Sequence, residues 1–150
     1  MEFGASIFFT DYSISPAALA VALEERGFDS LWAAEHSHIP VPRRTPPPGG
    51  GELPKRYYDV MDPFVTLTAA AAATKRLKLA TGICLVIQRD TIQTAKLVAS
   101  IDQVSGGRFL FGALHVLENF IEVIVFGAAF EGNLRRFHVQ RTHDDLVPEH

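Results

Sequence analysis

The stretch LKLATGICLV, residues 77–86, is a short apolar run that predicts a buried β-strand. The next segment, Thr91–Ser105, has apolar residues at helical spacing and predicts a helix that Gly106-Gly107 ends. The side chains expected to face inward from this helix are Ala95, Val98, Ala99 and Val104. A further apolar run, Arg108–Phe111, then predicts another strand. Strand, helix and strand in this order are typical of parallel strands joined by a crossover helix.

The same alternation extends toward the N-terminus. Phe3–Phe9 and Phe28–Ala33 are predicted strands, and Ala17–Arg26 between them is a predicted helix. Asp62-Pro63 begins another helix that continues through Phe64–Thr74, since an acidic cap followed by proline is a common helix start. The chain is therefore expected to be of the α/β class, with four parallel strands in chain order and helices on one face.

Two regions interrupt this alternation. Residues 35–61 are rich in proline and glycine, which excludes a helix or a central strand there and favours a functional or disordered loop, or a linker between domains. Residues 113–150 have a different texture, and Leu114–Phe126 is expected to be an amphipathic helix or a helix followed by a strand. The apolar region 109–130 contains acidic residues, so a buried strand plus helix is favoured over a membrane span.

Composition excludes several classes of protein. The chain has 150 residues, 47% of them hydrophobic and 21% charged, which is ordinary for one globular domain. Its net charge of -3 offers no electrostatic attraction for nucleic acid or an anionic membrane. A single cysteine, Cys84, excludes an internal disulfide and a cysteine-rich zinc site. The expected location is the cytoplasm, because no secretory signal opens the chain.

Polar residues near the predicted strand ends are candidates for function. His36 follows the second strand, and with His38 it forms an H-x-H pair, but no further ligand completes a metal site. Four cationic residues flank the loop: Arg43, Arg44, Lys55 and Arg56. They could close over an anionic cofactor or a substrate carboxylate, or simply form a solvated surface.

Several segments, taken together and in order, resemble one protein family. These segments are Phe28–Trp32, Glu35-His36, Asp62–Phe64, Leu77–Gly82, Thr94–Lys96 and Ser105–Phe109. They are similar to the luciferase-like monooxygenase family, in particular its coenzyme F420-dependent oxidoreductases, and the similarity covers residues 1–112. The resemblance implies the N-terminal half of a (β/α)8 TIM-type barrel, truncated or divergent after the fourth strand. It also implies a small-molecule substrate, with coenzyme F420 as cofactor and FMN as the alternative.

The resemblance also implies particular site residues. His36 would be a catalytic residue, with Glu35 as the second member, because hydride transfer must be matched by proton transfer and imidazole titrates near neutral pH. Thr81, Gly82, Ile83 and Cys84 would form the wall behind the cofactor ring. A non-proline cis peptide is expected in this wall, most directly at Gly82–Ile83.

The chain departs from the family in length. A complete barrel needs about 250 residues, and residues 113–150 match nothing in the family pattern. We interpret residues 1–112 as a partial barrel and 113–150 as a divergent tail rather than a separate domain. The alternatives are a flavin-dependent monooxygenase of the same family and a truncated, non-catalytic partner. Open sheet edges and an exposed inner face predict a homo-oligomer.

Overall fold

The computed structural model describes residues 1–42, 46–47, 50–117, 120–127 and 134–137 of the chain. Its sheet begins with parallel strands that follow one another in chain order: β1 (Gly4–Ile7), β2 (Ser30–Ala33), β3 (Lys78–Thr81) and β4 (Phe109–Leu117). The predicted strand order and direction are therefore confirmed.

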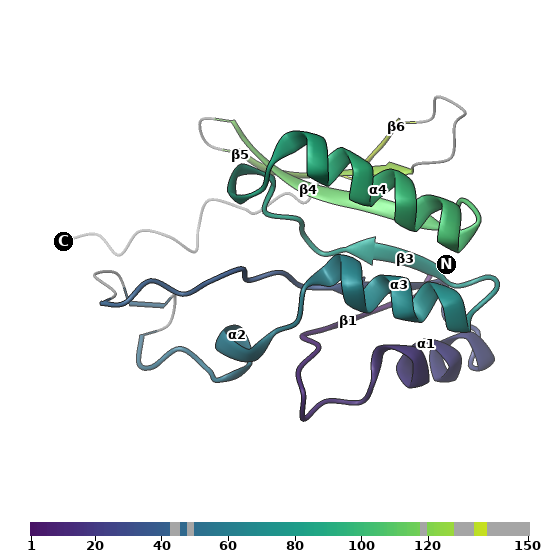
Figure 1. Cartoon of the computed structure of the whole chain (residues 1–150), viewed down its shortest axis with the longest axis horizontal. Helices are drawn as coiled ribbons and strands as arrows, with labels where there is room; N and C mark the ends of the chain where they lie inside the picture. Colours follow the sequence, from purple (N-terminus) through teal and green to yellow (C-terminus); the bar gives the residue numbers. More distant parts are fainter. Residues whose placement is uncertain (43–45, 48–49, 118–119, 128–133, 138–150) are drawn as a thin grey trace.

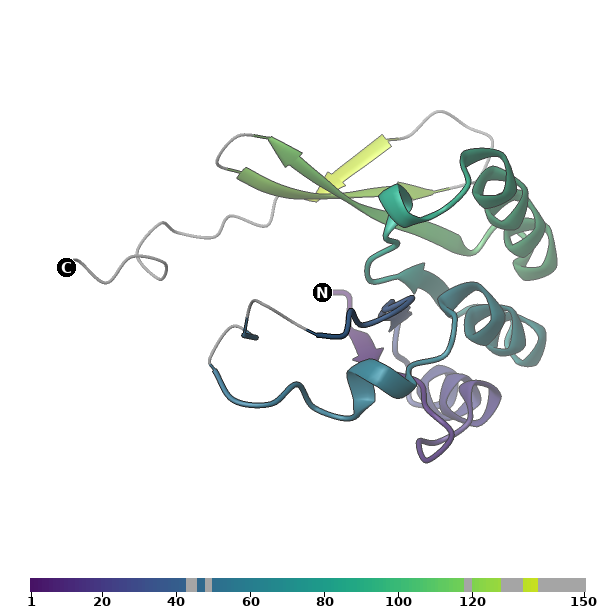
Figure 2. The same ribbon diagram turned by 60° about the vertical axis from the view of Figure 1, so that its left-hand side comes forward.

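The long helices lie on one side of this sheet, as predicted (Figures 1 and 2). They are α1 (Pro16–Glu25), α3 (Pro63–Ala73) and α4 (Thr91–Ser105). Each begins at a side-chain cap, supplied by Ser15, Asp62 and Asp90 respectively, because an oxygen there accepts N–H groups of the first turn. Helix α4 ends at Gly106, whose φ of 68° is the left-handed conformation that glycine adopts most easily.

The core lies between these helices and the sheet. Leu31, Leu79 and Phe109 occupy the same row across β2, β3 and β4, and none of them is accessible to solvent. They belong to the same buried cluster as Phe64 and Leu67 of α3. Burial of a large apolar side chain contributes about 1.5–3 kcal/mol, so this layer is the main stabilising contact between helix and sheet.

The second half of the chain corrects one prediction. Residues 114–117 and 120–126 form strands instead of a helix: β4 runs on to Leu117 and pairs with the antiparallel strand β5 (Phe120–Gly127), which pairs in turn with β6 (Leu134–Phe137). The region is rich in β-branched residues, which favour strands over helices. The division at residue 112 stays a prediction, although β4 continues across it.

Three local features also differ from the predictions: the end of β3, an additional helical turn and the buried face of α4. β3 ends at Thr81 rather than Val86; an isolated bridge still joins Cys84 to Ala113, and the chain then forms a short 3-10 helix, η1 (Val86–Gln88). A single helical turn, α2 (Arg56–Asp59), lies in the Pro- and Gly-rich loop. The buried residues of α4 are Thr94, Ile101 and Ser105, whereas Ala95, Ala99 and Val104 are exposed and Val98 is half-buried. The buried face of α4 therefore differs from the predicted one, and Ala95, Val98 and Ala99 line an open groove instead.

Within the described residues, none of the helices combines the length and apolar character needed to span a bilayer.

Candidate functional site

The carboxyl ends of β2, β3 and β4 meet at one rim of the sheet, which we call the upper rim. Beyond β3, the N–H of Gly82 donates to the carbonyl of Ala33 at 2.8 Å, and the N–H of Cys84 donates to the carbonyl of Gly112 at 2.7 Å. The segment 82–84 is therefore held by both neighbouring strands. Carboxyl ends of parallel strands are where ligands bind in α/β sheets and barrels.

A second contact joins β3 to β4 below this segment. The Thr81 hydroxyl donates to the Gly112 carbonyl at 2.8 Å and accepts the Gly112 N–H at 2.9 Å, and both groups are buried. A Cβ at position 112 would lie 2.2 Å from the carbonyl oxygen of Thr81. The close approach of the two strands thus requires glycine there.

The four residues predicted to form a cofactor wall divide into two kinds. Thr81 and Cys84 are buried, whereas Gly82 and Ile83 are half-buried and open to the rim. The Gly82–Ile83 peptide is cis, as the sequence resemblance implied. Burial raises the pKa of the Cys84 thiol to about 12, so this thiol stays protonated near neutral pH.

His36 lies at the upper rim in an aromatic cluster. Its ring stacks on Phe8, with centroids 5.9 Å apart, and meets Tyr57 edge-on at 4.8 Å. The guanidinium of Arg56 lies over the rings of both Phe8 and Tyr57. Burial lowers the pKa of His36, partly opposed by the charge of Glu35, so the imidazole is mostly neutral at pH 7.

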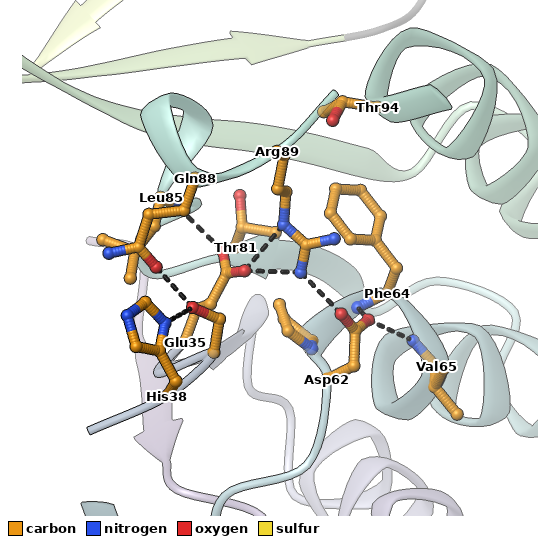
Figure 3. A network of polar contacts seen from close by, with 12 residues as sticks. Glu35, His38, Asp62, Phe64, Val65, Thr81, Leu85, Gln88, Arg89 and Thr94 are labelled. Carbon is orange, nitrogen blue, oxygen red and sulfur yellow. Dashed lines mark hydrogen bonds and ion pairs between the residues drawn. The ribbon is translucent and has the colours of Figure 1, made fainter. Parts of the chain in front are cut away.

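Glu35, the residue before His36, lies in a polar network with Arg89 and Asp62 (Figure 3). Its side chain is only 2% exposed, and one carboxylate oxygen accepts the Leu85 N–H at 2.7 Å while the other accepts Arg89 Nε at 2.6 Å. Arg89 also pairs with Asp62 Oδ2 at 2.5 Å. Both Glu35 oxygens are therefore engaged, and the arginine bridges two carboxylates.

Asp62 combines this ion pair with the predicted cap of α3. Its Oδ1 accepts the N–H groups of Phe64 and Val65. Burial disfavours the charged form of Arg89, but the hydrogen bonds to Asp62 and Glu35 hold its pKa above the ordinary value. Its guanidinium lies 4.9 Å from the centre of the Phe64 ring, which adds a cation–π contact.

Sequence reasoning missed Arg89 altogether and interpreted Asp62 only as a cap. The available signal was weak: an arginine directly before the acidic cap of a helix, with its partners 27 and 54 positions away. Among sequence-predicted residues, the structure brings together Glu35 and the wall segment, through Leu85, and it places His36 beside a small cavity of about 210 Å³ that Glu35, Asp62 and Arg89 also line.

The other candidates lie apart from this network. His38 is exposed and forms a 3.0 Å hydrogen bond with the Ser37 hydroxyl, which also contacts Gln88. Lys55 pairs with Asp59 and lies over Tyr12. Arg43 and Arg44 lie outside the described residues. Across the part of the chain that is described, no three His, Cys, Asp or Glu side chains converge as metal ligands.

Comparison of the chain with known proteins shows which family and which relatives it is similar to. The family model described as luciferase-like monooxygenase matches residues 15–138. An uncharacterised protein of Mycobacterium tuberculosis is 42% identical over 115 residues, which are 75% of this chain and 41% of the relative. The chain therefore spans about two fifths of the length of this curated relative.

Two solved structures share the fold. Monooxygenase RslO1 from Streptomyces bottropensis superimposes with a TM-score of 0.59 and 27% identity, over 79% of this chain and 35% of that chain. The coenzyme F420-dependent tetrahydromethanopterin reductase from Methanopyrus kandleri superimposes with a TM-score of 0.52 and 26% identity, over 75% of this chain and 26% of that one. These two likenesses cover 79% and 75% of this chain, and they confirm the predicted fold class.

Proposed function

The chain belongs to the luciferase-like monooxygenase family, and on that premise we propose that its upper rim binds a redox cofactor, coenzyme F420 or alternatively FMN, for oxidoreduction of a small organic substrate. The observation that carries the proposal is the half-buried pair Gly82 and Ile83 just after β3, hydrogen-bonded to the end of β2, from which the chain continues to His36. Likeness to an F420-dependent reductase supports the choice of F420. The reaction would take place in the cytoplasm.

The residues present fit a flat ring system. Gly82 has no side chain, and a Cβ there would lie 3.3 Å from the Trp32 side chain, so the wall packs closely on Trp32 without a protruding group of its own. Behind it, Thr81 and Cys84 are buried and fastened to Gly112, which keeps the wall in one position. A deazaflavin or flavin bound here would supply hydride transfer. The wall of the chain itself would orient the ring and exclude water from one of its faces.

His36 would move the proton that must accompany this chemistry. Its pKa is lowered by burial, so the neutral imidazole can accept a proton at pH 7. Stacking on Phe8 and the edge contact with Tyr57 limit the rotation of the ring. Glu35, in contrast, has both oxygens engaged by Leu85 and Arg89, which supports a role in holding the site.

A monooxygenase activity is the second candidate. The TM-score and identity with monooxygenase RslO1 are at least as high as those with the F420-dependent reductase. Such an enzyme would use reduced flavin and molecular oxygen in place of F420. The two activities separate by cofactor preference and by whether turnover consumes oxygen.

The test is to titrate the purified chain with F420 and with FMN and to follow cofactor fluorescence, then to measure turnover of His36→Ala. Loss of turnover of about 10²–10⁴-fold is expected for removal of an acid–base group. His38→Ala is the matched control, since His38 is an exposed histidine two residues away. Binding of neither cofactor would contradict the proposal and favour a non-catalytic partner.

We also propose that the chain associates with itself. Among the described residues, β1 pairs with β2 alone and leaves a parallel edge open. An apolar groove of about 520 Å³ lies along α4, lined in part by Ala95, Val98 and Phe111. Sedimentation velocity should show a dimer or larger species, and a sharp monomer boundary with cooperative unfolding would contradict this.

A further inference from the structure

The backbone that follows β3 is fixed through side chains of other elements. Leu85 follows the predicted wall residues Thr81–Cys84 and donates its N–H to Glu35 at 2.7 Å, and we call residues 82–85 the wall segment. Glu35 follows β2, and its buried carboxylate is held in turn by Arg89. The segment 82–85 thus has a support at its far end besides the backbone contacts of Gly82 and Cys84 with the neighbouring strands.

Arg89 extends this support to a helix. Its guanidinium bridges Glu35 and Asp62, and Asp62 caps α3 through its other oxygen. The end of β2, the wall segment and the start of α3 are therefore connected by one carboxylate–arginine–carboxylate chain (Figure 3). Because a buried carboxylate without its partner is strongly unfavourable, Glu35 can keep this place only while Arg89 is present.

We propose that Glu35 and Arg89 are positioning residues that hold the wall segment 82–85 in its place at the upper rim, rather than residues that exchange protons with a substrate. The claim concerns the protein alone, and it rests on the proposed function only in taking this segment as the surface that a cofactor contacts. Removal of the arginine should release the segment locally, while the core between sheet and helices stays folded.

The single cysteine of the chain reports on this segment. Cys84 is 1% exposed, so a small alkylating reagent can reach it only when the segment opens. The experiment compares the rate of Cys84 alkylation in the wild type and in Arg89→Leu, at neutral pH without denaturant. We expect alkylation to be about tenfold faster or more in the variant, because the buried Glu35 charge loses its partner.

The direction of the change separates movement from electrostatics. After burial and the Glu35 charge, which both raise the pKa of Cys84, the Arg89 charge acts in the opposite direction and lowers it. Loss of the arginine without any movement would therefore raise the thiol pKa further and slow alkylation. Faster alkylation supports the proposal, and unchanged or slower alkylation in a folded variant overturns it.

Two milder variants keep the test informative if Arg89→Leu does not fold. Asp62→Asn can still accept N–H groups at the start of α3 but loses the charge that faces Arg89, and it should accelerate alkylation to a smaller extent. Arg89→Lys keeps the charge and should restore part of the protection. Equal alkylation rates in Asp62→Asn, Arg89→Lys and wild type would overturn the proposal.

A control at the opposite rim separates local opening from global unfolding. Glu24→Gln removes the charge of the α1 carboxylate that accepts N–H groups from the loop before β3, and denaturant unfolding gives the loss of global stability for each variant. In Glu24→Gln, the rate of Cys84 alkylation should rise only as much as the loss of global stability explains. In Arg89→Leu, the rate should rise by more than the loss of global stability explains. If the rise in alkylation rate is explained by the loss of global stability in both variants, Cys84 is exposed only by global unfolding, and the proposal is overturned.

Cofactor binding is then a separate measurement. Weaker binding of F420 or FMN to Arg89→Leu supports both the positioning role and the cofactor wall. If alkylation is accelerated but cofactor affinity is unchanged, the positioning role of Glu35 and Arg89 stands, and the wall segment is not the cofactor surface. Failure of the further inference and failure of the proposed function are thus distinguishable.

Discussion

Arg89 and Arg108 lie at opposite rims of the same sheet and bind different kinds of partner. The lower rim is the one at the amino ends of β3 and β4, opposite the upper rim. At the upper rim, Arg89 binds the carboxylates of Glu35 and Asp62. At the lower rim, Arg108 donates to the backbone carbonyls of Ala71, Thr74, Leu77 and Ser105 and to the Thr74 hydroxyl. Hydrogen bonds with the two carboxylates raise the pKa of Arg89 despite burial, whereas burial lowers the pKa of Arg108.

The difference indicates a division of labour between the rims. Arg108 donates hydrogen bonds to carbonyl groups at the end of α3 and in the turn to β3, and these contacts stabilise the fold itself. Arg89 instead orients a buried carboxylate and the segment beside it. In (β/α)8 barrels the carboxyl ends of the strands carry function and the opposite ends carry stability, and the two arginines follow that pattern.

Arg108→Leu should cause the largest loss of stability. Five hydrogen bonds disappear, and the carbonyls at the end of α3 lose their donors, so we expect a loss of about 3 kcal/mol in the free energy of unfolding. Urea denaturation measures it, with Arg76→Leu, an exposed arginine nearby, as the control. Equal urea midpoints for Arg108→Leu and Arg76→Leu would contradict the stabilising role of Arg108 at the lower rim.

Gly112→Ala should destabilise by about 2 kcal/mol, because the new Cβ would overlap the Thr81 carbonyl oxygen and force β3 and β4 apart. Gly82→Ala is the matched variant at the same rim. Its nearest neighbour would be the Trp32 side chain, at 3.3 Å, so its effect on unfolding should be smaller. Thermal unfolding of both variants checks this order, and a larger loss for Gly82→Ala would contradict it.

Glu24→Gln should cost about 1 kcal/mol and make stability less dependent on acid pH. Burial tends to raise the pKa of Glu24, but hydrogen bonds from the N–H groups of Arg76, Leu77 and Lys75 together lower it. The stabilisation is therefore present above the ordinary pKa of 4.5 and is lost as pH falls through the lowered value. Urea titrations from pH 7 to pH 3 should show this loss in the wild type and not in the variant, with the exposed Glu25→Gln as control.

His36→Ala should have the smallest effect on stability, within about 0.5 kcal/mol at pH 8, because its ring lies outside the core cluster. Burial lowers the pKa of His36, so the unfolded chain binds more protons just below pH 6.5. The wild type should therefore lose slightly more stability than the variant as pH falls through that window. Unfolding curves at pH 8 and pH 5.5 measure the difference, and a large loss at pH 8 would assign His36 to the fold.

The parallel sheet followed from the sequence because its signals are local. Short apolar runs such as Phe28–Ala33, capped starts such as Asp62-Pro63 and the glycine after Ser105 each act within a few residues. The antiparallel hairpin of β4 and β5 was missed because an apolar run with scattered acids suits either a helix or a strand. Pairing with a neighbouring strand decides between them.

The sequence by itself determined the family, the α/β class and the candidates His36 and Thr81–Cys84, because these depend on residue types in a fixed order along the chain. Only the tertiary structure decided that Glu35 binds Arg89 and the Leu85 N–H, and that Asp62 shares this network. The physical reason is that a buried carboxylate must find a cation and an N–H donor within hydrogen-bond distance. Which residues provide them depends on where distant parts of the chain come together, and no local pattern records that.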